Sequence, residues 1–117
     1  LIATGFHRET TREELADKFG EEYLDRDDIR FVVHKSHNKE EMKEMGVLPS
    51  GGILKVNRIA AEADLLISEG FIEPHFFAGF SGGRKSILPG ICNEVTVNEN
   101  HSYRAISNQS ECKNGNP

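Results

Sequence analysis

The sequence is short of cysteine, of long apolar runs and of basic residues, and each shortage excludes a class of protein. Cys92 and Cys112 are its only cysteines and lie in neither a CxxC nor a metal-ligand spacing, so we expect reduced thiols. No apolar stretch approaches the roughly 20 residues that cross a bilayer, and no basic start followed by an apolar segment indicates secretion, so we expect a cytoplasmic protein. Because 19 acidic residues outnumber 14 basic ones, nucleic acid is not an expected partner.

The hydrophobic content is low as well. A share of 37% over 117 residues is lean for a core of this size, which predicts one small domain that depends on neighbouring sequence. The chain opens with Leu1 inside an apolar run and closes at Pro117 without a terminating element, so we expect a piece of a longer protein.

Three apolar runs predict the strands of an α/β fold. They cover residues 1–4, 29–33 and 65–68, and the last two are expected to be buried. The first and third runs each lead into a loop that carries a histidine. Open α/β sheets bind their ligands at the carboxyl ends of such strands.

The remaining signals predict helices, one hairpin and a tail. Thr11 and Glu14 form a capping box that predicts a helix from 11 to about 19, ended by Gly20. Asn57 can cap a short helix that runs to about residue 63. A helical turn and then a hairpin around residues 49–52 are expected, residues 92–106 fit a strand or a helix with the helix favoured, and 106–117 is expected to be an irregular tail.

The glycine-rich segment GFSGGRKS at residues 79–86 is the first candidate site. Ser81, Gly82, Gly83 and Lys85 lie at a predicted turn into a helix, where backbone N–H groups attract an anion such as phosphate. The P-loop pattern requires glycine directly before lysine, and Arg84 stands there, so ATP hydrolysis is not expected. The competing interpretation is a tight turn that needs positive φ at its glycines.

Histidines supply the second set of candidates. His75 lies beside the glycine-rich segment and His7 follows the first predicted strand, so both imidazoles would face one crevice if these strands are neighbours in a parallel sheet. Two bases that flank one site suit a racemase, although a single loop histidine is more often a packing residue. His101 has no partner at HxxxH spacing, so a metal bound there would need ligands from elsewhere. His34 and His37 are expected at the surface.

The segment EPHFFAGFSGGRKSILPGI, residues 73–91, resembles the signature of the nickel-dependent lactate racemase family. The stretches TGFHRETTREEL, VNRIAAEADLLISEG and NENHS agree with that family in the same order. The resemblance implies that residues 1–117 are part of the N-terminal domain of a two-domain α/β enzyme. It also implies that this domain is Rossmann-like, with a mostly parallel sheet and flanking helices.

The resemblance further implies racemisation or epimerisation of a 2-hydroxy acid such as lactate. His7 and His75 would each remove the hydroxyl proton of one enantiomer while hydride moves to a nickel-pincer nucleotide. Lys85 would tether that cofactor through a thioamide and His101 would bind its nickel. The substrate, the cofactor-synthesis proteins and the C-terminal domain would be the partners.

The C-terminal residues that would bind the substrate carboxylate are not part of this sequence, and the segment SNQSECKNGNP is less typical of the family. Composition alone leaves two other hypotheses, a noncatalytic phosphate or mononucleotide-binding module around residues 81–85 and a domain that serves only assembly.

Overall fold

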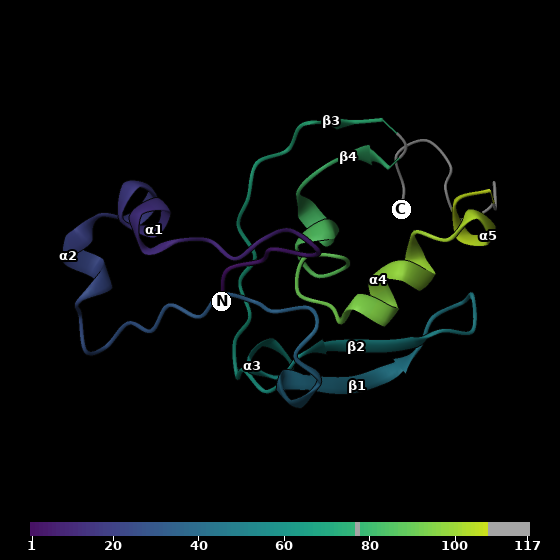
Figure 1. The fold of residues 1–117 in the computed structure, drawn as a ribbon, viewed down its shortest axis with the longest axis horizontal. Coiled ribbons are helices and arrows are strands. Elements are labelled where there is room, and N and C mark those ends of the chain that lie inside the picture. Colours follow the sequence, from purple (N-terminus) through teal and green to yellow (C-terminus); the bar gives the residue numbers. More distant parts are fainter. Residues whose placement is uncertain (77, 108–117) are drawn as a thin grey trace.

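The computed structural model describes residues 1–76 and 78–107 (Figure 1). Helices α1 (Arg12–Phe19) and α2 (Glu21–Leu24) lie at one end of the molecule, and α4 (Glu94–Asn100) and α5 (Tyr103–Ile106) lie at the other. Across the described ranges we find no helix with the length and apolar character needed to cross a membrane.

Helix α1 (Arg12–Phe19) confirms the predicted capping box. The Glu14 N–H donates to the Thr11 hydroxyl at 3.3 Å, and the Thr11 N–H donates to the Glu14 carboxylate at 2.9 Å. Gly20 ends the helix with φ +93°, a conformation that costs glycine little. The short helix α2 (Glu21–Leu24) follows at once.

The predicted helical turn and hairpin are also confirmed. The 3-10 turn η1 (Lys39–Glu41) leads into β1 (Met42–Val47), which pairs antiparallel with β2 (Ile53–Asn57). Asn57 then caps α3 (Arg58–Ala61), because its side-chain oxygen accepts from the Ile59 N–H at 3.0 Å. This helix ends two residues before the expected limit at Ala63.

The final stretch of the described chain is mostly helical, as favoured for residues 92–106. Asn93 caps α4 (Glu94–Asn100) and Ser102 caps α5 (Tyr103–Ile106). The helix expected near Arg84 is the 3-10 turn η2 (Gly83–Ser86), which follows the small hairpin of β3 (Pro74–His75) and β4 (Gly79–Phe80). The tail prediction for 108–117 lies outside the described residues.

The strand predictions are where the structure departs most from the sequence analysis. Residues 1–4 and 29–33 meet at a single parallel bridge, Ile2 with Val33. Residues 65–68 form no strand, and Leu65 and Ile67 are 77% and 79% exposed, so the prediction of a buried strand there is wrong for this chain. An apolar run forms a strand only beside a hydrogen-bonded neighbour, and the described residues place none there.

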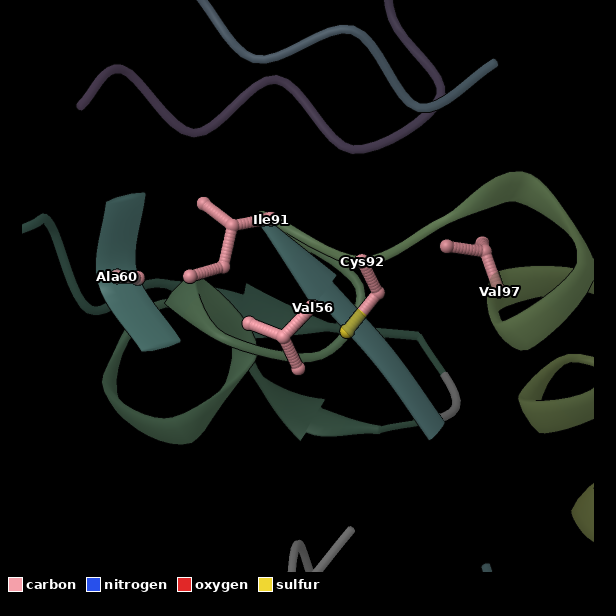
Figure 2. Close-up of a cluster of buried hydrophobic side chains, with 5 residues drawn as sticks. All are labelled: Val56, Ala60, Ile91, Cys92 and Val97. Atoms are coloured by element: carbon pink, nitrogen blue, oxygen red, sulfur yellow. The ribbon is translucent and has the colours of Figure 1, made fainter. Parts of the chain in front are cut away.

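The fold is therefore a small α/β unit, but not the expected mostly parallel sheet. Within the described ranges its sheets, β1 with β2 and β3 with β4, are both antiparallel and two-stranded. The apolar cluster of the core joins β2, α3, α4 and the segment before α4. Figure 2 shows its members: Val56, Ala60, Ile91, Cys92 and Val97.

Candidate functional site

The β3–β4 hairpin positions the glycine-rich segment. His75 pairs with Gly79 across the hairpin, and the Ser81 N–H donates to the Glu73 carbonyl at 2.8 Å. The Ser81 hydroxyl accepts from the Glu73 N–H at 3.1 Å. These two bonds close the hairpin at Ser81. Because η2 begins two residues later, they also fix the position of its first residue.

Gly82 and Gly83 both have positive φ, +74° and +54°, so the tight-turn interpretation holds for both residues. They differ in their surroundings. A Cβ at Gly82 would lie 2.2 Å from the Phe71 carbonyl oxygen, whereas a Cβ at Gly83 would meet nothing within 4 Å. Packing against residue 71 therefore requires Gly82, while the backbone at Gly83 faces open space into which a ligand could approach.

Lys85 follows in η2, where its backbone N–H donates to the Gly82 carbonyl at 3.1 Å. Burial lowers the pKa of its side chain from the ordinary value, because a partly dry environment disfavours the ammonium. A lower pKa raises the fraction of neutral amine, which is the form that can make a bond to carbon.

His75 lies within electrostatic reach of the other two candidates in this region. Its pKa is lowered first by burial and then by the positive charges of Lys85 and His101. The imidazole stacks on Phe76, with ring centroids 4.8 Å apart, and its Nδ1 accepts from the Ala78 N–H at 3.3 Å. In the neutral form the ring proton is therefore on Nε2.

His101 ends α4 with a defined tautomer. Its Nδ1 lies 2.9 Å from the Val97 carbonyl oxygen, and because a carbonyl only accepts, Nδ1 carries the proton. The lone pair is then on Nε2. This is the arrangement that metal-binding histidines adopt when a backbone carbonyl orients the ring.

His7 lines a cavity whose lining residues do not include His75, Lys85 or His101. His7 is exposed on a turn closed by its own N–H, which donates to the Thr4 carbonyl at 2.9 Å. The cavity has a volume of about 290 Å³, and His37 and Glu94 also line it. The turn remains linked to the segment after η2, because the Gly5 N–H donates to the Gly90 carbonyl at 2.9 Å.

His34 is the residue that sequence reasoning misplaced. It is 1% exposed rather than at the surface, whereas His37 is exposed as expected. Its Nε2–H donates to the Cys92 carbonyl at 2.9 Å, and its Nδ1 accepts from the Asn57 amide at 3.2 Å. Burial is the largest cause of its lowered pKa. The position of His34 directly after the apolar run FVV was the sequence signal that could have predicted its burial.

Cys92 fits the expectation of a reduced thiol. The side chain is fully buried and donates to the Ile87 carbonyl at 3.1 Å. Burial raises its pKa to about 12, so it does not form a reactive thiolate near neutral pH. Cys112 lies outside the described residues.

A metal site made only of protein groups is not found in the described part of the chain, where no three His, Cys, Asp or Glu side chains gather for one ion. The arrangement is instead one lysine and two histidines around a glycine-rich turn, on a small α/β unit. Such a set can hold an organic group covalently, offer a single imidazole to a metal and move a proton.

The chain belongs to the family described as the lactate racemase N-terminal domain, whose sequence model matches residues 1–113. The lactate racemase of Thermoanaerobacterium thermosaccharolyticum is 59% identical over 108 residues, which are 92% of this chain and 25% of that protein. The lactate racemase of Lactiplantibacillus plantarum is 55% identical over 116 residues, 99% of this chain and 27% of that protein.

A solved structure agrees with these relatives. The lactate racemase apoprotein from T. thermosaccharolyticum matches with a TM-score of 0.76 and 61% identity, over 81% of this chain and 22% of that one. The chain thus spans about a quarter of the length of the curated relatives it matches.

Proposed function

We propose that the protein containing this chain is an isomerase that racemises a 2-hydroxy acid such as lactate. The names of the two relatives support this reaction class. The observation that carries the proposal for this chain is the family match over residues 1–113. Within that match His75 is the candidate base, and the charges of Lys85 and His101 lower its pKa.

The residues fit a nickel-pincer nucleotide bound at this place. Lys85 has the lowered pKa that favours bond formation, the backbone at Gly83 faces open space, and His101 has its lone pair on Nε2. Lys85 would hold the cofactor covalently and His101 would bind its nickel. When bound, the cofactor supplies the hydride acceptor and the remaining metal ligands.

His75 is suited to the proton transfer. A pKa below the ordinary value of 6.5 keeps its imidazole neutral, and therefore basic, at neutral pH. In the tautomer of the structure the lone pair is on Nδ1, which accepts from Ala78. A base acting through Nε2 would need the other tautomer, which releases that long hydrogen bond. His7 would serve the opposite enantiomer, which requires its turn to be held close to η2.

The remaining parts of the proposal concern the longer protein. The parallel bridge of Ile2 with Val33 would belong to a mostly parallel, Rossmann-like sheet whose other strands lie elsewhere in that protein. A C-terminal domain would bind the substrate carboxylate, and dedicated proteins would synthesise the cofactor. The shared length of about a quarter leaves room for that domain.

Mass spectrometry of the full-length protein, made together with cofactor-synthesis proteins, tests the tether. We expect an adduct that peptide mapping places on Lys85, and its loss in Lys85→Arg. Lys35→Arg is the matched control, because Lys35 is a partly exposed lysine paired with Glu9 at 3.0 Å, and it should keep the adduct. Active protein with an unmodified Lys85 would refute the tether.

Kinetics of the same preparation test the two bases. We expect His75→Gln and His7→Gln each to lower kcat for lactate racemisation by roughly 10²–10⁴-fold while the adduct on Lys85 remains. If both variants keep the wild-type rate, the histidines are packing residues and the chain serves assembly. Binding of a mononucleotide without any racemisation would favour the noncatalytic module instead.

A further inference from the structure

Among the residues that the structure describes, the largest fully buried side chains are three polar ones and one apolar one. They are His34, Asn57, Thr96 and Cys92. Within the described ranges every buried side-chain nitrogen and oxygen has a hydrogen-bond partner. A buried polar group without a partner is destabilising, so such an arrangement specifies one set of neighbours.

His34 uses all of its polar atoms to join segments that are distant in the sequence. Its backbone carbonyl accepts from the Thr4 hydroxyl at 2.8 Å, and its Nε2–H donates to the Cys92 carbonyl at 2.9 Å. Its Nδ1 accepts from Asn57 at the end of β2. One residue thus bonds directly to the segment before His7, to the segment after Lys85 and to the hairpin.

The neighbours of His34 extend this link to the helix that carries His101. The Asn93 amide donates to the Ser36 carbonyl at 2.9 Å, and the Glu94 N–H donates to the same oxygen at 3.0 Å. Both bonds fix the first turn of α4. The segment of His34 therefore contacts the residues before His7, the segment between Lys85 and His101, and the first turn of α4, which carries His101.

We propose that His34 is a positioning residue that holds the turn of His7 against the segment joining Lys85 to His101. This role rests on the proposed function, since it concerns how His7 reaches the same substrate as His75. His34 touches no reacting group and acts through its hydrogen bonds to Thr4, Asn57 and the Cys92 carbonyl. His34 would affect the reaction rate through the position of His7, because a displacement of about 1 Å at a proton-transfer group can lower the rate roughly 100-fold.

The role needs one donor and one acceptor on the same side chain. A neutral imidazole provides both, and so does the amide of glutamine, which can donate toward Cys92 and accept from Asn57. Leucine fills a similar volume with neither group, and it leaves the Cys92 carbonyl and the Asn57 amide without their partner. His34→Gln is therefore the rescue variant and His34→Leu the disrupting one.

Hydrogen exchange of the full-length apoprotein, followed by mass spectrometry, tests the positioning without any cofactor. We expect His34→Leu to speed exchange in a peptide covering residues 1–8 by about tenfold or more, since the Gly5 and His7 amides are bonded in that turn. Exchange across 12–24 should not change. His34→Gln should restore most of the protection.

Thr96→Val is the matched control for loss of a buried polar group. The Thr96 hydroxyl donates to the Ile53 carbonyl at 2.8 Å and accepts from the Lys55 N–H at 3.0 Å, so it joins α4 to β2 and not to the turn of His7. Its faster exchange should be confined to β2 and α4. Equal acceleration across the whole chain in His34→Leu, or no change in residues 1–8, would overturn the proposal.

Kinetics of the cofactor-loaded enzyme complete the test. We expect His34→Leu to lower kcat roughly 10- to 100-fold with little change in KM and with the Lys85 adduct retained, and His34→Gln to recover most of the rate. A wild-type kcat in His34→Leu would overturn the positioning role. Failure of wild-type protein to racemise any 2-hydroxy acid would instead refute the proposed function, and the exchange result would still decide whether His34 holds the turn.

Discussion

The centre of the molecule buries polar side chains, whereas the segment of residues 65–72 exposes apolar ones. At the centre, the polar side chains of His34, Asn57 and Thr96 are 1% exposed or less. In the segment, apolar side chains such as Ile67 and Phe71 are 79% and 80% exposed. Polar groups can be buried by a few directional bonds, whereas apolar side chains need a large area of neighbours. The described chain supplies the hydrogen-bond partners for the polar centre, but it does not supply the apolar neighbours that would bury residues 65–72.

Gly82 lies where the exposed segment meets the candidate site. Of the substitutions considered, Gly82→Ala should cause the largest loss in the free energy of unfolding. The added Cβ would lie 2.2 Å from the Phe71 carbonyl oxygen, at a φ of +74°. We expect a loss of about 3 kcal/mol in the free energy of unfolding, measured by denaturant titration. Gly83→Ala, with φ +54° but no neighbour within 4 Å, should lose only about 1 kcal/mol. Equal losses would show that Phe71 does not pack on this turn.

Asn57→Ala should have the next largest effect, at the polar centre. It removes the amide that donates to His34 and the oxygen that caps α3. We expect a loss of about 2 kcal/mol by thermal or denaturant unfolding. Asn38→Ala is the control, because Asn38 caps only the short η1 near the surface, and should cost less than about 1 kcal/mol. Similar values for both variants would show that the buried pair adds nothing beyond capping.

Because the imidazole of His34 is neutral in the folded protein, we expect the stability of the fold to depend on pH. Its folded pKa lies below the ordinary 6.5, so the unfolded chain binds more protons. The stabilisation is therefore complete above pH 6.5 and is lost as the pH falls below that value toward the folded pKa. We expect Tm to fall in this window and the fall to be smaller in His34→Gln. His75 has a shift of the same sign, so the difference between the two proteins is the measurement.

The carboxylates lose their contribution to stability at a lower pH than His34 does, so the two effects can be separated. Arg8 holds the pKa of Glu14 at about 2, below its ordinary 4.5, so stabilisation by that pair is lost only below about pH 4.5. If His34→Gln leaves the slope between pH 7 and 5 unchanged, the buried imidazole is not the group that titrates.

The smallest expected effect belongs to the exposed segment. In the 117-residue chain, Ile67→Ser should change the free energy of unfolding by no more than about 0.5 kcal/mol, because the side chain is 79% exposed. Val97→Ala, at a site 3% exposed in the core, should cost about 2 kcal/mol in the same assay. A large loss for Ile67→Ser would mean that the segment is covered in solution, and would remove the contrast between the two regions.

Local signals in the sequence predicted the local elements well. The Thr11 capping box, the Asn57 cap and the turn at 49–52 each depend on a few adjacent residues, and each led to the helix or hairpin observed. Strand pairing depends on distant residues. The apolar pattern of 65–68 predicted burial but could not supply the neighbour that would bury it.

Residue types and spacing pointed to His75, Lys85 and His101 as candidate site residues, and their roles stay predictions. The structure places His75 where the charges of Lys85 and His101 both lower its pKa. The place of His7 in a separate cavity could not be predicted, because it depends on how the first segment meets residue 90. The burial of His34 was also missed, since its partners Asn57 and Cys92 lie 23 and 58 residues away.

We proposed that Lys85 and His101 hold one nickel-containing cofactor beside His75. The nickel content of the purified full-length protein is the direct test of this proposal. We predict close to one nickel per protein chain by elemental analysis in the wild type, together with the adduct on Lys85. His101→Ala should keep the adduct but lose most of the nickel, and Lys85→Arg should lose both. Nickel that stays fully bound in His101→Ala, with unchanged lactate racemisation, would contradict the account.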